Sequence, residues 1–98
     1  MKIPATVIWY NPDDENIKNI RTYIDYVEKL YIIDNSKENN KKLADSLNNL
    51  KTEYIYNDKN LGIAKALNLA CEKAANDNFE WLLTMDQDSS FDSNSIKS

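Results

Sequence analysis

The stretch ATVIWY, Ala5 to Tyr10, is a short run of β-branched and aromatic residues near the start of the 98-residue chain. A continuous apolar run of this length predicts a strand buried on both faces, as in a parallel sheet. Asn11 to Glu15 (NPDDE) follows, with turn-forming residues and with acids that favour the first turn of a helix. The chain is therefore expected to begin with a buried strand that leads into a helix.

The same alternation continues along the chain. Apolar residues recur at spacings of three or four in three segments, which predicts three amphipathic helices. These residues are Ile17, Ile20, Ile24 and Val27; then Leu43, Leu47 and Leu50; then Ile63, Leu67, Ala70, Cys71 and Ala74. Compact or alternating apolar runs predict the remaining strands at Lys29 to Asp34 (KLYIID), Glu53 to Asn57 (EYIYN) and Glu80 to Asp86 (EWLLTMD).

Alternating strands and helices predict an α/β fold, with a mainly parallel sheet in a three-layer α/β/α arrangement and right-handed crossovers. A chain of 98 residues supports one hydrophobic core, so a single domain is expected. Trp9 and Trp81 lie inside predicted strands and are expected in the core. The polar tail from Ser89 to Ser98 is expected to be loosely held.

The composition argues against several classes of protein. The formal net charge is -4 and Arg21 is the only arginine, which disfavours a nucleic-acid surface. Cys71 is the only cysteine, so no disulfide within the chain is expected, and its place on an apolar helix face favours core packing. No apolar run is long enough to span a bilayer, and no signal-like segment begins the chain. The expected location is the cytoplasm, including the inner face of the cell membrane.

Catalytic motifs of several common enzyme classes are missing from the sequence. It contains no histidine and one glycine, Gly62. A glycine-rich dinucleotide motif, a P-loop, a Cys/His zinc cluster and a Ser-His-Asp triad all need residues that the chain lacks. Nicotinamide dehydrogenases, P-loop enzymes, zinc sites and hydrolases of the triad type are therefore unsupported.

Polar residues follow each predicted strand at the point where the strand ends. In an open parallel sheet, ligands bind in the crevice beyond the carboxyl ends of the strands, where the strand order reverses. The residues at these positions are Asn11; Asp34, Asn35 and Ser36; Asn57 and Asp58; and Asp86, Gln87 and Asp88. They form the candidate site.

The acidic pair Asp86 and Asp88 is the main chemical feature. If the chain stays extended there, both carboxylates leave the same face and converge. Converging carboxylates repel unless a cation neutralises them, and Mg²⁺ or Mn²⁺ suits oxygen ligands. The alternative is a solvated acidic turn.

Three other positions have both a functional and a structural interpretation. Asp34 could meet a ribose or base, or could be an Asx-turn residue. Asn11 is equally a candidate for a helix cap. Gly62 indicates a backbone that needs positive φ or close approach.

Four segments in order carry a family resemblance: VIWYNPD (Val7 to Asp13), YIIDNS (Tyr31 to Ser36), NLGIAKALN (Asn60 to Asn68) and WLLTMDQDS (Trp81 to Ser89). Together they resemble the inverting family-two glycosyltransferases of the GT-A fold, especially the bacterial rhamnosyltransferase-like branch. The resemblance spans nearly the whole chain. Ser36 departs from it, because many relatives carry a Gly-Ser pair there.

The resemblance implies roles for individual residues. Asp86 and Asp88 match the family's D-x-D element, in which Asp88 would reach the metal and Asp86 the ribose or, through water, the metal. The residues that would line the nucleoside pocket are Tyr10, Asn11 and Asp34. Those of the loop and helix that would back the donor site are Asn60, Gly62 and Lys65.

The implied reaction is transfer of a sugar, with rhamnose suggested by the DQDS form, from a nucleoside-diphosphate donor to the hydroxyl of a glycan or lipid-linked acceptor. It proceeds with inversion and with assistance from Mg²⁺ or Mn²⁺, in polysaccharide biosynthesis. The family's general base lies well downstream of the D-x-D element and is expected beyond Ser98. Residues 1–98 are therefore expected to be the N-terminal donor-binding part, without transfer activity alone.

Two other function classes stay open. The first is a non-catalytic nucleotide- or metal-binding α/β module, for example a receiver-like domain. Receiver domains carry their acids after the first strand, whereas this strand ends in Tyr10 and Asn11. The second is a structural or interaction domain whose strand-end acids are simply solvated.

Overall fold

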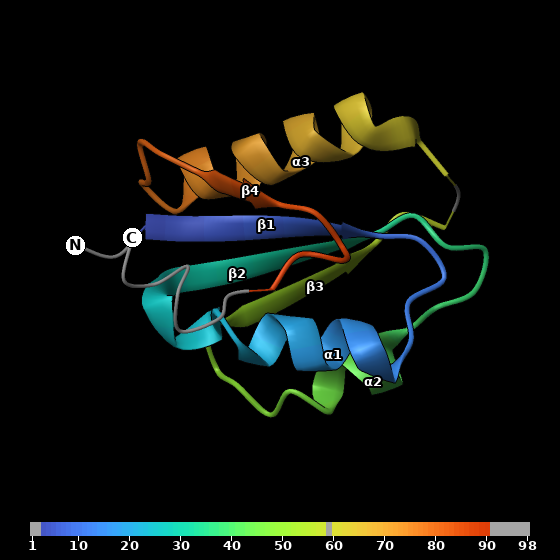
Figure 1. The fold of residues 1–98 in the computed structure, drawn as a ribbon. Helices are drawn as coiled ribbons and strands as arrows, with labels where there is room; N and C mark the ends of the chain where they lie inside the picture. The colour runs from blue at the N-terminus through green and yellow to red at the C-terminus, as the bar shows by residue number, and fades with distance from the viewer. Residues whose placement is uncertain (1–2, 59, 91–98) are drawn as a thin grey trace.

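The computed structural model describes residues 3–58 and 60–90 and shows a parallel sheet between two layers of helices (Figure 1). The strands are β1 (Ile3–Trp9), β2 (Val27–Asp34), β3 (Thr52–Tyr56) and β4 (Leu83–Met85). The helices are α1 (Asp14–Arg21), α2 (Lys41–Asp45) and α3 (Gly62–Asn76), with a 3-10 turn η1 (Ile24–Tyr26) before β2. The predicted α/β class, with its parallel sheet and flanking helices, is confirmed.

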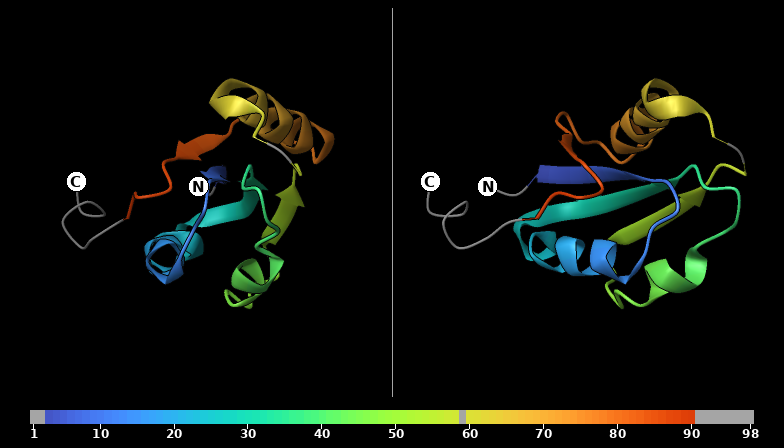
Figure 2. Two further views of the ribbon diagram at one scale, coloured as in Figure 1. Left: turned by 90° about the vertical axis from the view of Figure 1, so that its right-hand side faces the viewer. Right: turned by 45° about the vertical axis from the view of Figure 1, so that its right-hand side comes forward.

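The strand order is β3-β2-β1-β4. The chain moves outward from β1 through β2 to β3, then crosses back by α3 so that β4 pairs with the other side of β1. The order therefore reverses between β1 and β4. Beyond the carboxyl ends of these two strands lies the crevice that open α/β sheets use for ligands. Figure 2 shows α3 on one face of the sheet and α1 with α2 on the other.

Each face of the sheet has its own apolar cluster. Alternate side chains of β1, such as Val7 and Trp9, pack with α1 and α2, as the two-residue period of a strand requires. Tyr31 and Ile33 of β2 pack on the opposite face against α3. The buried residues of α3 are alanines at spacings of four, which lets the helix lie close to the sheet: Ala66, Ala70 and Ala74.

Helix α1 is shorter than predicted. It begins at an Asp13 cap whose side chain accepts hydrogen bonds from two backbone amides, and Asn16 completes a capping box. It ends at Arg21, because the next backbone bonds span three residues rather than four, as in Tyr23 N to Ile20 O at 3.0 Å. The expected helical stripe thus breaks before Val27, which begins β2.

Other local expectations were wrong. Helix α2 spans only five residues, and Leu50 is 105% exposed rather than buried on a helical face. The fourth strand covers three residues instead of the expected seven from Glu80 to Asp86, and Trp81 is 71% exposed. Cys71 is also exposed, because α3 buries its alanines. Trp9, by contrast, is in the core as expected.

The described helices have no membrane-spanning character. Within residues 3–58 and 60–90, no helix combines the length and the apolar character needed to cross a bilayer.

Candidate functional site

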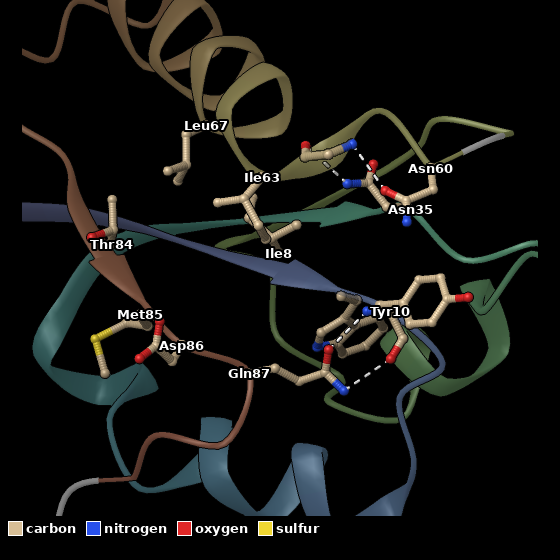
Figure 3. Close-up of a pocket in the computed structure, with 12 residues that line it drawn as sticks. Ile8, Tyr10, Asn35, Asn60, Ile63, Leu67, Thr84, Met85, Asp86 and Gln87 are labelled. Atoms are coloured by element: carbon tan, nitrogen blue, oxygen red, sulfur yellow. Dashed lines mark hydrogen bonds between the residues drawn. The ribbon is translucent and has the colours of Figure 1, made fainter.

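A pocket of about 370 Å³ opens where the strand order reverses (Figure 3). We call it the switch-point pocket. It is lined by the ends of β1 and β4, the first turns of α3 and the loop before α3. Lining residues include Ile8, Tyr10, Asn60, Ile63, Leu67 and Asp86. One side of the pocket is therefore apolar, and its rim carries the carboxylate of Asp86 and the amide of Asn60, as in many small-molecule sites.

Gln87 joins the two strands at the rim of this pocket. Its side-chain Oε1 accepts a hydrogen bond from Tyr10 N at 2.7 Å, and its Nε2 donates to Tyr10 O at 3.2 Å. The carboxamide thus continues the pairing of β1 with β4 beyond the last paired residues, Val7 and Met85. Figure 3 shows both bonds. This role could not be predicted from the sequence, because the two residues lie 77 positions apart.

The acidic pair does not have the geometry expected from an extended chain. Strand β4 ends at Met85, and Ser89 N donates to Asp86 O at 3.0 Å, which closes a turn. The expectation of an extended segment through Asp88 was wrong. Asp86 lines the switch-point pocket, whereas Asp88 Oδ1 lies 3.4 Å from Asn16 Nδ2 on α1. The two side chains therefore have different neighbours, and both are exposed.

Asp34 is fully buried, and its carboxylate is occupied by protein donors. Oδ1 accepts from Ser36 N at 3.0 Å, and Oδ2 accepts from Tyr54 Oη at 2.6 Å and Asn40 Nδ2 at 3.0 Å. The bond to Ser36 is the Asx-turn contact expected of the structural alternative. Asp34 is not among the residues that line the switch-point pocket. Its contact with a nucleotide stays a prediction.

Asn11 lies at a second, smaller hollow of about 350 Å³ with Lys37 and Asn40. It adopts a positive φ of 48°, and its backbone N donates to Ser36 Oγ at 2.7 Å. It does not cap α1, since Asp13 does. Ser36 is thus buried between the loops that follow β1 and β2, even though the family's Gly-Ser pair is not present.

The start of α3 approaches the pocket through residues predicted from the family motif. Asn60 Oδ1 accepts from Gly62 N at 2.9 Å, and Gly62 has a φ of +81°. The positive φ explains why glycine is needed here, since no atom would meet an added Cβ within 4 Å. Lys65 is exposed and does not line the pocket.

Asn35 is a pocket residue to which the sequence assigned no separate role. It is 2% exposed, accepts from Asn57 Nδ2 at 2.7 Å and donates to Gly62 O at 3.4 Å. It therefore links the ends of β2 and β3 to the first residue of α3. Its position directly after a buried strand was the available signal.

Carboxylate oxygens are the type of ligand that a hard cation such as Mg²⁺ prefers. Mg²⁺ commonly takes one or two protein carboxylates together with substrate phosphates. Asp86 and Asp88 offer two carboxylates on one short turn. Within residues 3–58 and 60–90, no group of three or more His, Cys, Asp or Glu side chains is arranged to hold a metal ion.

Comparison with known proteins agrees with the fold. The family model described as glycosyl transferase family 2 matches residues 14–98. In the other two comparisons, no curated protein and no solved structure matched the chain. The matched region includes α1, all of the sheet except β1, the start of α3 and the acidic turn. The chain therefore belongs to glycosyl transferase family 2.

Proposed function

We propose that the switch-point pocket binds the donor of a glycosyl transfer, a nucleoside-diphosphate sugar, with help from Mg²⁺ or Mn²⁺. The supporting observation is the place of Asp86: it lines a pocket at the reversal of strand order in a chain of glycosyl transferase family 2. Ligands of open α/β sheets bind at this place. The pocket volume of about 370 Å³ is of the size used for small ligands.

Different parts of the pocket suit different parts of such a donor. Tyr10 is 49% exposed, and its ring offers a face on which a base can stack. Ile63 and Leu67 supply apolar surface from the first turns of α3. Asp86 and Asp88 lie in the turn that follows β4 and offer carboxylate oxygens to the cation that accompanies a diphosphate. We assign the nucleoside to the first group and the diphosphate to the second.

The remaining residues of the proposed donor site have different parts in it. Asn11, which follows Tyr10 in the chain, borders the second hollow together with Lys37. Asp34 would act through the loop that it fixes, because its oxygens already accept from Ser36, Asn40 and Tyr54. Asn60, Gly62 and Lys65 shape the loop and first turn behind the donor.

The proposed reaction is displacement of the nucleoside diphosphate from the sugar by an acceptor hydroxyl, with inversion. A bound cation would neutralise charge on the departing diphosphate. Asp86 and Asp88 would hold that cation. We propose rhamnose as the sugar and a glycan or lipid-linked acceptor as the partner, in the cytoplasm or at the inner face of the cell membrane.

Calorimetric titration of the chain with a nucleoside diphosphate, with and without Mn²⁺, tests the proposal. We expect saturable binding that depends on the ion. Asp86→Asn should weaken the ion-dependent binding, because it removes a negative ligand from the rim. Asp25→Asn is the matched control, since Asp25 is an exposed acid in η1, before the start of β2. Absence of binding in both conditions would support a structural domain instead, and binding that ignores the ion would support a plain nucleotide-binding module.

A further inference from the structure

Gln87 is the middle residue of the acidic triplet, and its carboxamide is fully engaged by the protein. Oε1 accepts from Tyr10 N at 2.7 Å. Nε2 donates to Tyr10 O at 3.2 Å and to Asn16 Oδ1 at 3.0 Å. Both N–H groups of the amide therefore have acceptors. The side chain between the two carboxylates is built into the protein, rather than free to meet a ligand.

Asn16 is the second anchor of the same turn. It is 5% exposed, and its Nδ2 donates to Gln87 O at 3.2 Å and to Asp88 Oδ1 at 3.4 Å. Its Oδ1 also accepts from Asp13 N at 2.9 Å, within the capping box of α1. The start of α1 is thus connected through one amide to the acidic turn. Asn16 is itself buried, and reciprocal hydrogen bonds made by a buried amide favour a single arrangement.

Among residues 3–58 and 60–90, the turn has few other attachments. Strand β4 pairs with β1 over only three residues, and the pairing stops at Met85. Beyond it, the backbone bond from Ser89 N to Asp86 O closes the turn on itself but does not attach it to the sheet. The position of Asp86 over the pocket and of Asp88 beside α1 therefore depends on Gln87 and Asn16.

We propose that Gln87 is a positioning residue: by fixing the turn to Tyr10 and Asn16, it sets where the two carboxylates stand for the cation and the diphosphate. The inference rests on the proposed function of the pocket. Partners that orient metal ligands from behind commonly change metal affinity by about 10- to 100-fold when they are altered. In this role Gln87 acts through the two carboxylates and is not itself a ligand of the cation.

For Gln87→Glu, a positioning role and a simple effect of charge predict opposite changes in Mn²⁺ affinity. The substitution keeps the size of the side chain but replaces the donor with an oxygen that faces Tyr10 O and Asn16 Oδ1. If charge near the cation were all that mattered, the added carboxylate would tighten Mn²⁺ binding. Positioning predicts weaker Mn²⁺ binding, by about tenfold or more. Mn²⁺ affinity is measured by paramagnetic resonance in the presence of a nucleoside diphosphate.

Two control variants separate positioning from general effects. Ile20→Val removes one methyl group from a core residue that is 1% exposed, so it lowers stability without touching the turn. Asn76→Asp makes the same amide-to-acid change at an exposed residue at the far end of α3. Both should bind Mn²⁺ as the unchanged chain does, even where the unfolding temperature falls.

The outcomes are distinguishable. Equal or tighter Mn²⁺ binding by folded Gln87→Glu, with normal binding by the unchanged chain, contradicts the positioning role alone. Failure of the unchanged chain to bind contradicts both this role and the proposed function. Gln87→Asn covers the case in which Gln87→Glu does not fold: its carboxamide is one methylene group shorter and cannot span Tyr10 and Asn16 together. Loss of ion-dependent binding in that variant supports the role, and unchanged binding overturns it.

Discussion

The phenol of Tyr54 donates a hydrogen bond of 2.6 Å to Oδ2 of Asp34, a carboxylate with 0% exposure at the end of β2. The same oxygen of Tyr54 accepts from Asn40 N at 2.8 Å. Burial, followed by the bond to Asp34, raises the pKa of Tyr54 above its ordinary value, so the phenol keeps its proton at neutral pH. The pair thus fixes the loop after β2 next to the candidate site.

Tyr54→Phe should lower the free energy of unfolding by about 1–3 kcal/mol, because it leaves a buried carboxylate with one donor fewer. Chemical unfolding in urea measures the change. Tyr56→Phe is the matched control, since the Tyr56 hydroxyl bonds Lys37 O in an exposed position. Its cost should stay within about 0.5 kcal/mol. Equal losses of unfolding free energy in the two variants would show that the bond from Tyr54 to Asp34 stabilises the fold no more than the exposed bond of Tyr56.

Asp77 predicts how stability changes in acid. Its carboxylate accepts hydrogen bonds from Lys29 Nζ at 2.7 Å and from Tyr31 Oη at 2.5 Å. These bonds, with Lys29 the larger cause, hold the pKa of Asp77 below its ordinary value of 3.8. Because the folded-state pKa is the lower one, charged Asp77 stabilises the fold above pH 3.8, and this contribution disappears as the pH falls through the folded-state pKa.

Asp77→Asn should therefore lower the unfolding temperature at neutral pH, and the difference from the unchanged chain should shrink below pH 3.8. Thermal unfolding followed by circular dichroism across this range measures it. If the difference in unfolding temperature between Asp77→Asn and the unchanged chain stayed constant down to the lowest pH, ionised Asp77 would not be a source of the stability.

Helix α3 approaches the sheet through alanines, so added volume there should be costly. Ala70 is 0% exposed against β2, and Ala70→Leu should destabilise the chain by about 1–3 kcal/mol through overpacking. Ala75→Leu places the same side chain at an exposed position of the same helix and should change stability by about 0.5 kcal/mol or less. Urea unfolding compares them. An Ala70→Leu variant as stable as the unchanged chain would mean that α3 packs less tightly on the sheet than the structure shows.

Gly62→Ala should cost about 1–2 kcal/mol, since a side chain disfavours its φ of +81°. Steric crowding is not the reason, because no atom lies within 4 Å of the added methyl group. Asn60→Ala, which removes the acceptor for Gly62 N, should act in the same direction. Unfolding measurements on both variants check this, and a stabilising Gly62→Ala would refute the argument.

Much of the fold could be predicted from the sequence, because burial imposes periodicity on it. The runs around Ala5 to Tyr10 and Lys29 to Asp34 are buried on both faces and form β1 and β2. The details that failed are those set by tertiary neighbours. Leu50 has helical spacing but no surface to pack against, and Trp81 precedes a strand that pairs over only three residues. Spacing alone does not contain that information.

The candidate site was predictable only in part. Tyr10, Asn60, Gly62 and Asp86 come together at one pocket, because parallel strands end at the same edge. The roles of Gln87, Asn16 and Asn35 could not be predicted, because each depends on hydrogen bonds between residues far apart in the chain. The turn at Asp86 likewise follows from where β4 stops pairing, which the local sequence does not specify.

Donor binding at the switch-point pocket is tested by a nuclear magnetic resonance titration of the isotope-labelled chain with a nucleoside diphosphate and Mg²⁺. We expect the backbone signals of Tyr10, Gly62 and Gln87 to shift together and Asp86→Asn to reduce these shifts. Unchanged signals at these residues would contradict donor binding at this pocket. So would shifts confined to Asn48 and Asn49, which line a separate hollow between α2 and β3.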